Sequence, residues 1–139
     1  MSMRIVVAEW LLRFTALAGI AVWAVTASAV RSDAVQRCGW FDNPTPSNAW
    51  LHDGAGEWAI GIQGGHQAKG NWPRFGSARW VPTGVGLAGY GCACMTVIAD
   101  AQSREVARIV SSRVQPLSVC RKDPALKHKE PWNPLKERR

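Results

Sequence analysis

Side chains that perform acid–base catalysis are scarce in this sequence. Residues 30–120 contain six acids and two histidines, and the whole chain contains ten acids and three histidines. It has no G-x-S-x-G motif of a serine hydrolase, and Gly84-Val85-Gly86 lacks the further glycine and the strand-helix context of a nucleotide-binding loop. With no convergent set of catalytic residues, the sequence favours a non-catalytic protein that uses no cofactor.

Two carboxylates keep an enzymatic alternative open. Asp42 and Glu57 can act as the acid and as the nucleophile or base of a glycosidase. Nothing in their spacing requires this pairing. A small carbohydrate-active enzyme directed at peptidoglycan is therefore the alternative to a binding protein.

The first 29 residues have the three parts of an export signal. Arg4 and Arg13 give a positive start, the 12 residues from Phe14 to Val25 are uncharged and apolar, and Ala27-Ser28-Ala29 matches the A-x-A cleavage pattern. A helix that spans a bilayer needs roughly 20 apolar residues, so a retained anchor is the weaker alternative. The sequence predicts a signal peptide over residues 1–29, a periplasmic or secreted protein, and no stable membrane insertion after cleavage.

The positive charge of the chain is concentrated at its C-terminus. Residues 121–139 carry seven bases and three acids, which is +4 of the total +7, together with Pro124, Pro131 and Pro134. This composition predicts a basic flexible tail over residues 124–139 that follows a single domain over residues 30–123. The tail is either a solvated terminus or a tether to an anionic surface. Nucleic acid is not expected as a partner, because the leader removes the chain from the cytoplasm.

The chain contains four cysteines, which allow three disulfide pairings: Cys38, Cys92, Cys94 and Cys120. A Cys92–Cys94 bond would close a very small ring and is disfavoured, so Cys38 pairs with one of these two residues and Cys120 with the other. In an oxidising compartment, disulfides are favoured over a metal site or a Cys94 nucleophile with His66 as its base. The spacing also lacks the C-x2-C pairs of structural zinc, and we expect no metal.

Short strands and turns are the pattern of the folded part. Residues 49–52 and 57–63 flank a turn and predict a hairpin. Residues 90–99 are apolar on both faces, as in a central strand, and residues 106–114 follow them after a polar turn. Pro116 opens one helical turn that includes Cys120. We therefore expect a mainly β fold, with a small α+β fold as the alternative, in which hairpins form an antiparallel sheet.

The connection from residue 64 to residue 89 is rich in glycine and, at 26 residues, is longer than an ordinary loop. Part of it, residues 79–81, can form a strand. Its aromatic and polar side chains suit a surface that stacks sugar rings and bonds their hydroxyl groups. The candidate binding residues are His66, Gln67, Trp72, Arg79 and Trp80.

Core packing is the alternative role of the tryptophans in this connection. Trp72 and Trp80 then cover a small core in which Trp40, Trp50 and Trp58 are also expected. Residues 43–48 contain three turn-forming pairs and predict a rigid loop that carries the chain over one end of the sheet.

Two long motifs carry a resemblance to a known family. Residues 37–51 (RCGWFDNPTPSNAWL), followed by GEW at 56–58 and QGG at 63–65, and residues 89–95 (GYGCACM) resemble the bacterial family called domain of unknown function 4087 over residues 37–123. The resemblance implies a small exported bacterial protein and carries no activity. We expect a binding or inhibitor module of the cell envelope, with an envelope protein or a glycan as its partner. A purely structural envelope protein is a further alternative.

Overall fold

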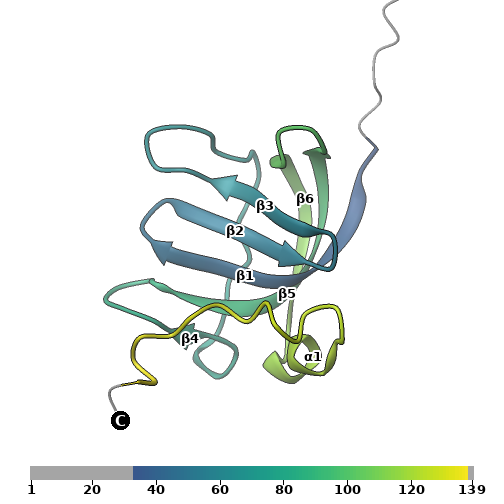
Figure 1. The fold of residues 1–139 in the computed structure, drawn as a ribbon. Coiled ribbons are helices and arrows are strands. Elements are labelled where there is room, and N and C mark those ends of the chain that lie inside the picture. Colours follow the sequence, from purple (N-terminus) through teal and green to yellow (C-terminus); the bar gives the residue numbers. More distant parts are fainter. Residues whose placement is uncertain (1–32, 138–139) are drawn as a thin grey trace, which may run out of the picture. The chain divides into compact units, whose positions relative to one another are not determined.

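The structure is a computed structural model that describes residues 33–137, and the predicted signal peptide lies outside the described residues. Strands predominate, which confirms the mainly β prediction (Figure 1). Between residues 33 and 137, no helix is long and apolar enough to span a membrane. The elements are β1 (Val35–Thr45), β2 (Asn48–Asp53), β3 (Gly56–Gly61), a 3-10 turn (Ser77–Arg79), β4 (Val81–Pro82), β5 (Gly89–Asp100), β6 (Glu105–Gln115) and α1 (Leu117–Lys122).

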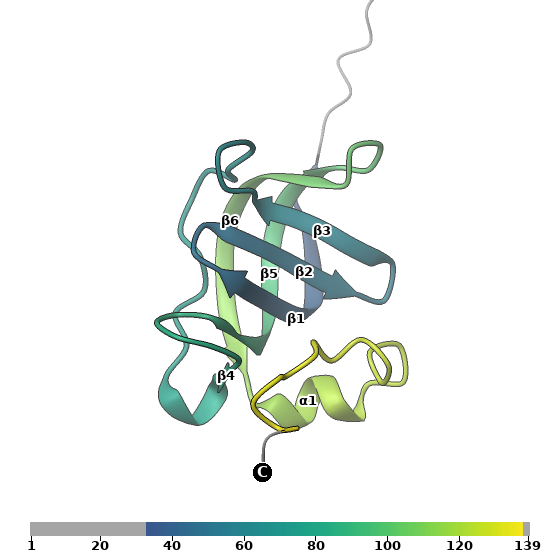
Figure 2. The ribbon, with the colours of Figure 1, turned by 60° about the vertical axis from the view of Figure 1, so that its left-hand side comes forward.

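Five of the strands close into a barrel. β1, β2 and β3 are joined by hairpins, β5 pairs antiparallel with β1 and with β6, and a parallel contact between Ala59 of β3 and Glu105 of β6 completes the ring. Figure 2 shows β1, β2 and β3 crossing in front of β5 and β6. The order β5-β1-β2-β3 is a Greek key, and a five-stranded Greek-key barrel is the architecture of OB-folds. The sheet is thus mixed, and not purely antiparallel as expected.

Two local predictions were wrong. The rigid loop predicted at residues 43–48 is mostly strand, because β1 continues to Thr45, β2 begins at Asn48, and only Pro46 and Ser47 form the turn. Ser47 has φ of 64°, which allows so tight a connection. Strand was also expected at residues 79–81, but Arg79 ends the 3-10 turn and β4 comprises only two residues.

Side-chain alternation fills the interior of the barrel. Ala93, Met95 and Val97 of β5 point inward and are fully buried, as do Phe41 of β1 and Trp58 of β3. Burial of a large apolar side chain contributes about 1.5–3 kcal/mol, so this cluster supplies most of the stability of the barrel.

A second apolar cluster lies on the outside of the barrel. Trp40, Tyr90 and Cys92 face outward from β1 and β5 and are covered by Cys120 of α1 and by Leu126 of the C-terminal segment. Figures 1 and 2 show α1 and this segment together at one side of the barrel. Of the three tryptophans expected in the core, Trp40 and Trp58 are buried, whereas Trp50 is half-buried at the surface of β2.

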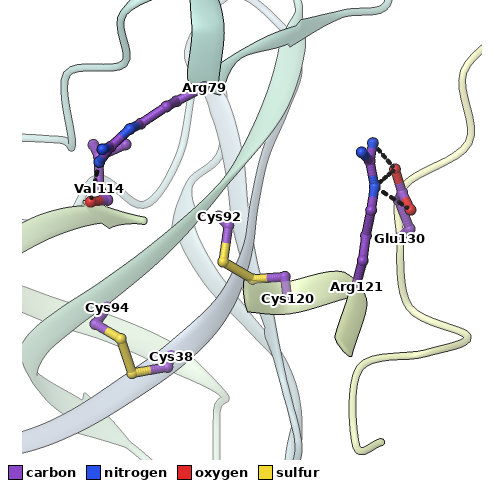
Figure 3. The surroundings of a disulfide bond; sticks show 8 residues. All are labelled: Cys38, Arg79, Cys92, Cys94, Val114, Cys120, Arg121 and Glu130. Carbon is purple, nitrogen blue, oxygen red and sulfur yellow. Dashed lines mark hydrogen bonds and ion pairs between the residues drawn. A yellow bond between two sulfur atoms is a disulfide. The ribbon is translucent and has the colours of Figure 1, made fainter. Parts of the chain in front are cut away.

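Both disulfides belong to the arrangement in which Cys92 and Cys94 have different partners (Figure 3). Cys38 bonds to Cys94, which lies directly opposite it in the β1–β5 ladder. Cys92 bonds to Cys120 and ties α1 to the barrel. Disulfides of this kind are typical of proteins outside the cytoplasm.

The segment after α1 makes specific contacts with the barrel. Leu126 is buried, Nζ of Lys129 donates to the backbone oxygens of Asp53 and Gly54, and Glu130 accepts hydrogen bonds from Arg121 and Tyr90 (Figure 3). The tail predicted from residue 124 remains a prediction in its boundary and its mobility. Its first part packs against the barrel because the proline-rich sequence also carries an apolar anchor at Leu126.

Glu130 makes the docking of this segment dependent on pH. Burial alone would raise the pKa of Glu130, but hydrogen bonds from Arg121 at 2.8 Å and from Tyr90 at 2.9 Å, with the charge of Arg121, outweigh burial and hold that pKa below its ordinary value of 4.5. Burial and the same carboxylate raise the pKa of Tyr90 to about 12.

The lowered pKa of Glu130 predicts a loss of stability in acid. Its contribution is present above pH 4.5 and is lost as the pH falls through the lowered pKa, because protonation removes the charge that Arg121 binds. Melting temperatures of the protein and of Glu130→Gln, measured between about pH 3 and pH 7, should differ most at neutral pH and converge below pH 4.5. A difference that stays constant across this range would contradict the assignment.

Candidate functional site

The long connection between β3 and β4 is anchored to the barrel at its start. Gln67 bridges to Gly61 of β3, and Lys69 bridges to Arg108 of β6 through backbone hydrogen bonds of 2.7 and 3.0 Å. Gly70 has φ of 99° and passes so close to the backbone of Ile109 that a Cβ atom would collide with it. Residues 66–70 therefore fill the gap where β3 and β6 have separated, and the rest of the connection starts from a fixed point.

Four aromatic rings then gather at one end of the barrel. Phe41 of β1 lies 5.7 Å from Trp72, 5.6 Å from Phe75 and 6.4 Å from Trp80, measured between ring centroids. Phe75 and Trp80 are 4.8 Å apart. Phe41 is buried, and the three rings of the connection are half-buried, so one side of the cluster packs on the core and the other reaches solvent.

Glycines of β5 create the space for these rings. Gly89 and Gly91 lie on the same face of β5 as the buried Ala93, opposite Asn43 and Phe41 of β1. A Cβ atom at Gly89 would collide with the indole of Trp80, and one at Gly91 would collide with the ring of Phe75. The alternating glycines thus let the connection insert aromatic side chains into the end of the barrel.

A pocket of about 420 Å³ opens beside this aromatic cluster. The four rings form most of its wall, and polar groups come from Asn43 at the end of β1 and from Asn71 and Arg74 of the connection. Asn43 is 7% exposed, while Asn71 and Arg74 are exposed at the rim. The pocket therefore combines aromatic faces with one enclosed amide and two accessible polar groups. Its lining consists of Phe41, Asn43, Asn71, Trp72, Pro73, Arg74, Phe75, Trp80 and Leu87.

A second hollow, of about 360 Å³, continues from the first. Asn43, Trp72 and Leu87 line both, and Gln67 lines the second. Leu87 is 81% exposed and Val85 is 94% exposed, on the turn between β4 and β5. Together the two hollows form one concave surface with an apolar turn at its edge.

The structure separates the candidate residues inferred from the sequence. Trp72 and Trp80 line the larger pocket and also pack against the core, so both interpretations of these tryptophans describe part of their role. Gln67 lines the second hollow, where its Nε2 donates to the backbone oxygen of Ser47 at 3.0 Å. His66 and Arg79 are engaged elsewhere: Nε2 of His66 lies 2.9 Å from the backbone oxygen of Val106, and Nη1 of Arg79 donates to that of Val114 at 3.0 Å (Figure 3).

Sequence reasoning missed the strand residues of the site. Asn43 was assigned to a connecting loop, and Phe41 and Phe75 were given no role in binding. Asn71 and Arg74 were noted as part of the glycine-rich connection, but they were not chosen as binding residues. Alternation from Phe41 to Asn43 on a strand would have placed both on the interior face, if β1 had been recognised.

The two carboxylates of the enzymatic alternative lie in a different cleft. Asp42 and Glu57 flank His52 on the outer face of the barrel, with Nε2 of His52 3.6 Å from Asp42 and Nδ1 3.3 Å from Glu57. His128 and Trp132 of the C-terminal segment complete this cleft of about 360 Å³. The part of the chain that the structure describes contains no group of three metal-ligating side chains, and its cysteines are all in disulfides.

The fold and the pocket define a class of protein: a small disulfide-bonded Greek-key barrel with an aromatic pocket at one end. Residues 32–127 match the model of the family described as protein of unknown function (DUF4087), and the chain belongs to this family. The match confirms the resemblance found in the sequence motifs. No curated protein and no solved structure shows significant similarity to the chain.

Proposed function

We propose that this protein is a non-catalytic binding module of the bacterial cell envelope, periplasmic or secreted, that holds a glycan in the aromatic pocket. The observation that carries the proposal is the arrangement of four aromatic rings around a pocket of about 420 Å³ with an enclosed amide. Largely apolar concave sites with a few placed polar groups are where small ligands bind. Two disulfides agree with a location outside the cytoplasm.

Sugar rings match this combination of groups. Their C–H faces pack on aromatic rings, and their hydroxyl groups exchange hydrogen bonds with amides and guanidinium groups. Trp72 offers a half-buried ring, and Asn71 and Arg74 stand exposed beside it. Because Trp72 and Trp80 are already packed against the core, their faces are held in place before a ligand arrives, which lowers the entropic cost of binding.

The geometry favours binding over catalysis. The lining of the aromatic pocket includes no carboxylate and no histidine among the described residues. In the cleft on the outer face, the side chain of Glu57 is 73% exposed, unlike the enclosed carboxylic acid that protonates a glycosidic oxygen. The carbohydrate-active alternative thus has its two carboxylates in one cleft but lacks the environment that would tune them.

Replacing Trp72 with alanine is expected to reduce binding to purified peptidoglycan about tenfold. Loss of one stacking ring removes about 1.4 kcal/mol of binding free energy, which is a factor of ten in affinity. Co-sedimentation of the protein with insoluble peptidoglycan, measured over a range of concentrations, gives the apparent Kd. Trp72→Ala with Trp80→Ala in one chain should abolish sedimentation.

Trp132→Ala is the matched control for this measurement. Trp132 is 69% exposed and lies in the cleft on the outer face, so its loss should leave binding unchanged. Arg74→Ala tests the rim of the pocket without removing core packing, and should also weaken binding. Equal sedimentation of the protein and of all pocket variants would sink the proposal, as would capture of an envelope protein that these variants leave intact.

A further inference from the structure

One polar atom at the junction of the two hollows has no partner. Nδ2 of Asn43 donates to the backbone oxygen of Leu87 at 3.2 Å. A carbonyl oxygen only accepts hydrogen bonds, so this contact fixes which end of the amide faces Leu87. Oδ1 of Asn43 is consequently the other end of the amide, and it is buried without a hydrogen-bond partner. The side chain belongs to a residue that is 93% buried and lines both hollows.

An unpartnered buried acceptor is costly and selects for a donor. Leaving a buried polar group without a hydrogen bond costs roughly 1–3 kcal/mol, and a ligand that donates to it recovers part of that cost. The walls around Asn43 are apolar, since Phe41, Trp72 and Leu87 surround it in the two hollows. A fitting ligand therefore carries a single donor with an apolar group next to it.

We propose that Asn43 reads the acetamido group of an N-acetylated amino sugar. Its N–H donates to Oδ1 of Asn43, and its methyl group packs against Phe41, Trp72 and Leu87. The acetamido carbonyl accepts from Asn71 or Arg74 at the rim of the pocket. This inference rests on the proposed glycan-binding function and specifies which sugars the pocket prefers.

Other common sugar substituents satisfy these groups less well. A hydroxyl group can donate to Oδ1, but it brings its own lone pairs into an apolar wall and no methyl group to fill it. An ammonium group would be desolvated and would stand near the guanidinium of Arg74. Selection for an amide N–H follows from the buried acceptor and from the apolar walls together.

Binding requires a shift of the turn that covers Asn43. Oδ1 is closed off in the unliganded protein, and Leu87, which holds the other end of the amide, lies on the turn between β4 and β5. Val85 and Leu87 expose 94% and 81% of their surface, so little side-chain packing opposes an outward movement of this turn. Once the turn has moved, Leu87 can close over the bound methyl group.

Three tetrasaccharides with the same β-1,4 linkage test this preference by isothermal titration calorimetry. They carry an acetamido group (N-acetylglucosamine), a hydroxyl group (glucose) or an ammonium group (glucosamine) at the same ring carbon. We expect the acetamido tetramer to bind about tenfold more tightly than either of the others, the gain from one hydrogen bond to a buried acceptor. In Asn43→Leu this preference should fall to about onefold, while the affinity for the glucose tetramer is unchanged.

Asn48→Ala provides the control. Asn48 also uses its amide, accepting from the backbone N–H of Gln63 at 2.8 Å, but it lines neither hollow, so the variant should keep the tenfold preference. Equal affinity of the acetamido and hydroxyl tetramers, or a preference that survives in folded Asn43→Leu, overturns the role of Asn43 while glycan binding stands. Failure of all three tetramers to bind, or binding of an uncharged apolar peptide in their place, overturns the proposed function as well.

Discussion

Replacing both Cys92 and Cys120 with alanine is expected to lower the free energy of unfolding by about 3.5 kcal/mol. The bond spans 28 residues, and the chain-entropy model assigns roughly this value to a loop of that length. Both residues are 1% exposed in the outer cluster, so the alanines also leave a small cavity beside Trp40. Urea unfolding followed by tryptophan fluorescence measures the loss, which approaches the total stability of a small domain.

The local consequence distinguishes this bond from the other disulfide. Cys92–Cys120 attaches α1 and thereby supports the docking of Leu126 and Glu130, so its loss should make residues 117–137 sensitive to protease before the barrel unfolds. The variant Cys38→Ala with Cys94→Ala removes a bond of separation 56 and costs about 4 kcal/mol by the same model. It should leave the protease pattern of the C-terminal segment intact. Identical cleavage patterns in the two variants would show that the segment is held independently of the disulfide.

Asp53→Asn is expected to destabilise the protein by about 3 kcal/mol, because Asp53 connects four groups at the β2–β3 turn. Its Oδ1 accepts from the backbone N–H groups of Ala55 and Gly56 and from the indole of Trp58, and its Oδ2 accepts from Nη1 of Arg37 at 2.8 Å. Asparagine can keep the first three contacts. It would set an amide N–H against the guanidinium of Arg37, which stacks on Trp58 at 3.6 Å and has no other ion-pair partner between residues 33 and 137.

Asp100→Asn is a matched control for this substitution. Asp100 makes the same kind of turn between β5 and β6, accepting from the backbone N–H groups of Gln102 and Ser103 at 2.7 and 3.0 Å. It is fully exposed and binds no arginine, so its replacement should have a much smaller effect. Thermal and urea unfolding of both variants give the comparison. A similar loss for Asp53 and Asp100 would mean that turn formation, and not the buried ion pair, accounts for the role of Asp53.

Local patterns were sufficient to find the hairpins. The continuous apolar run of β5 predicted a central strand, and β5 is indeed paired on both edges by β1 and β6. The turn at residues 53–56 predicted the β2–β3 hairpin, since Asp53 and Gly56 have strong turn preferences that act over a few residues. These elements are decided by contacts close in sequence, which is why the sequence contains their signal.

The strand that closes the barrel was not found in the same way. β1 contains Gly39 and Pro44, which disfavour a strand when each is considered alone. In the fold, Gly39 is required because a Cβ atom there would collide with the backbone of His52 in β2. The composition that hides β1 in the sequence is thus the composition that lets it lie between β2 and β5.

The candidate site shows the same division. Trp72 and Trp80 stood out because tryptophans in a long glycine-rich connection are unusual. Asn43 did not, because its importance depends on Leu87, 44 residues later in the chain, holding one end of its amide. His66 and Arg79 looked accessible in the sequence and are bound to backbone oxygens of β6 in the fold.

The four scarce cysteines and the few acids were enough, without a structure, to indicate an exported, disulfide-bonded and non-catalytic β protein. Composition and short-range patterning carry that information, because redox chemistry and turn formation depend on the residues themselves. Tertiary structure alone decided which cysteine meets which, that β1 and β5 close the barrel, and that an asparagine and four aromatic rings from distant segments share one pocket. These outcomes depend on strand pairing between residues far apart in the chain, whose cost and gain appear only when the barrel forms.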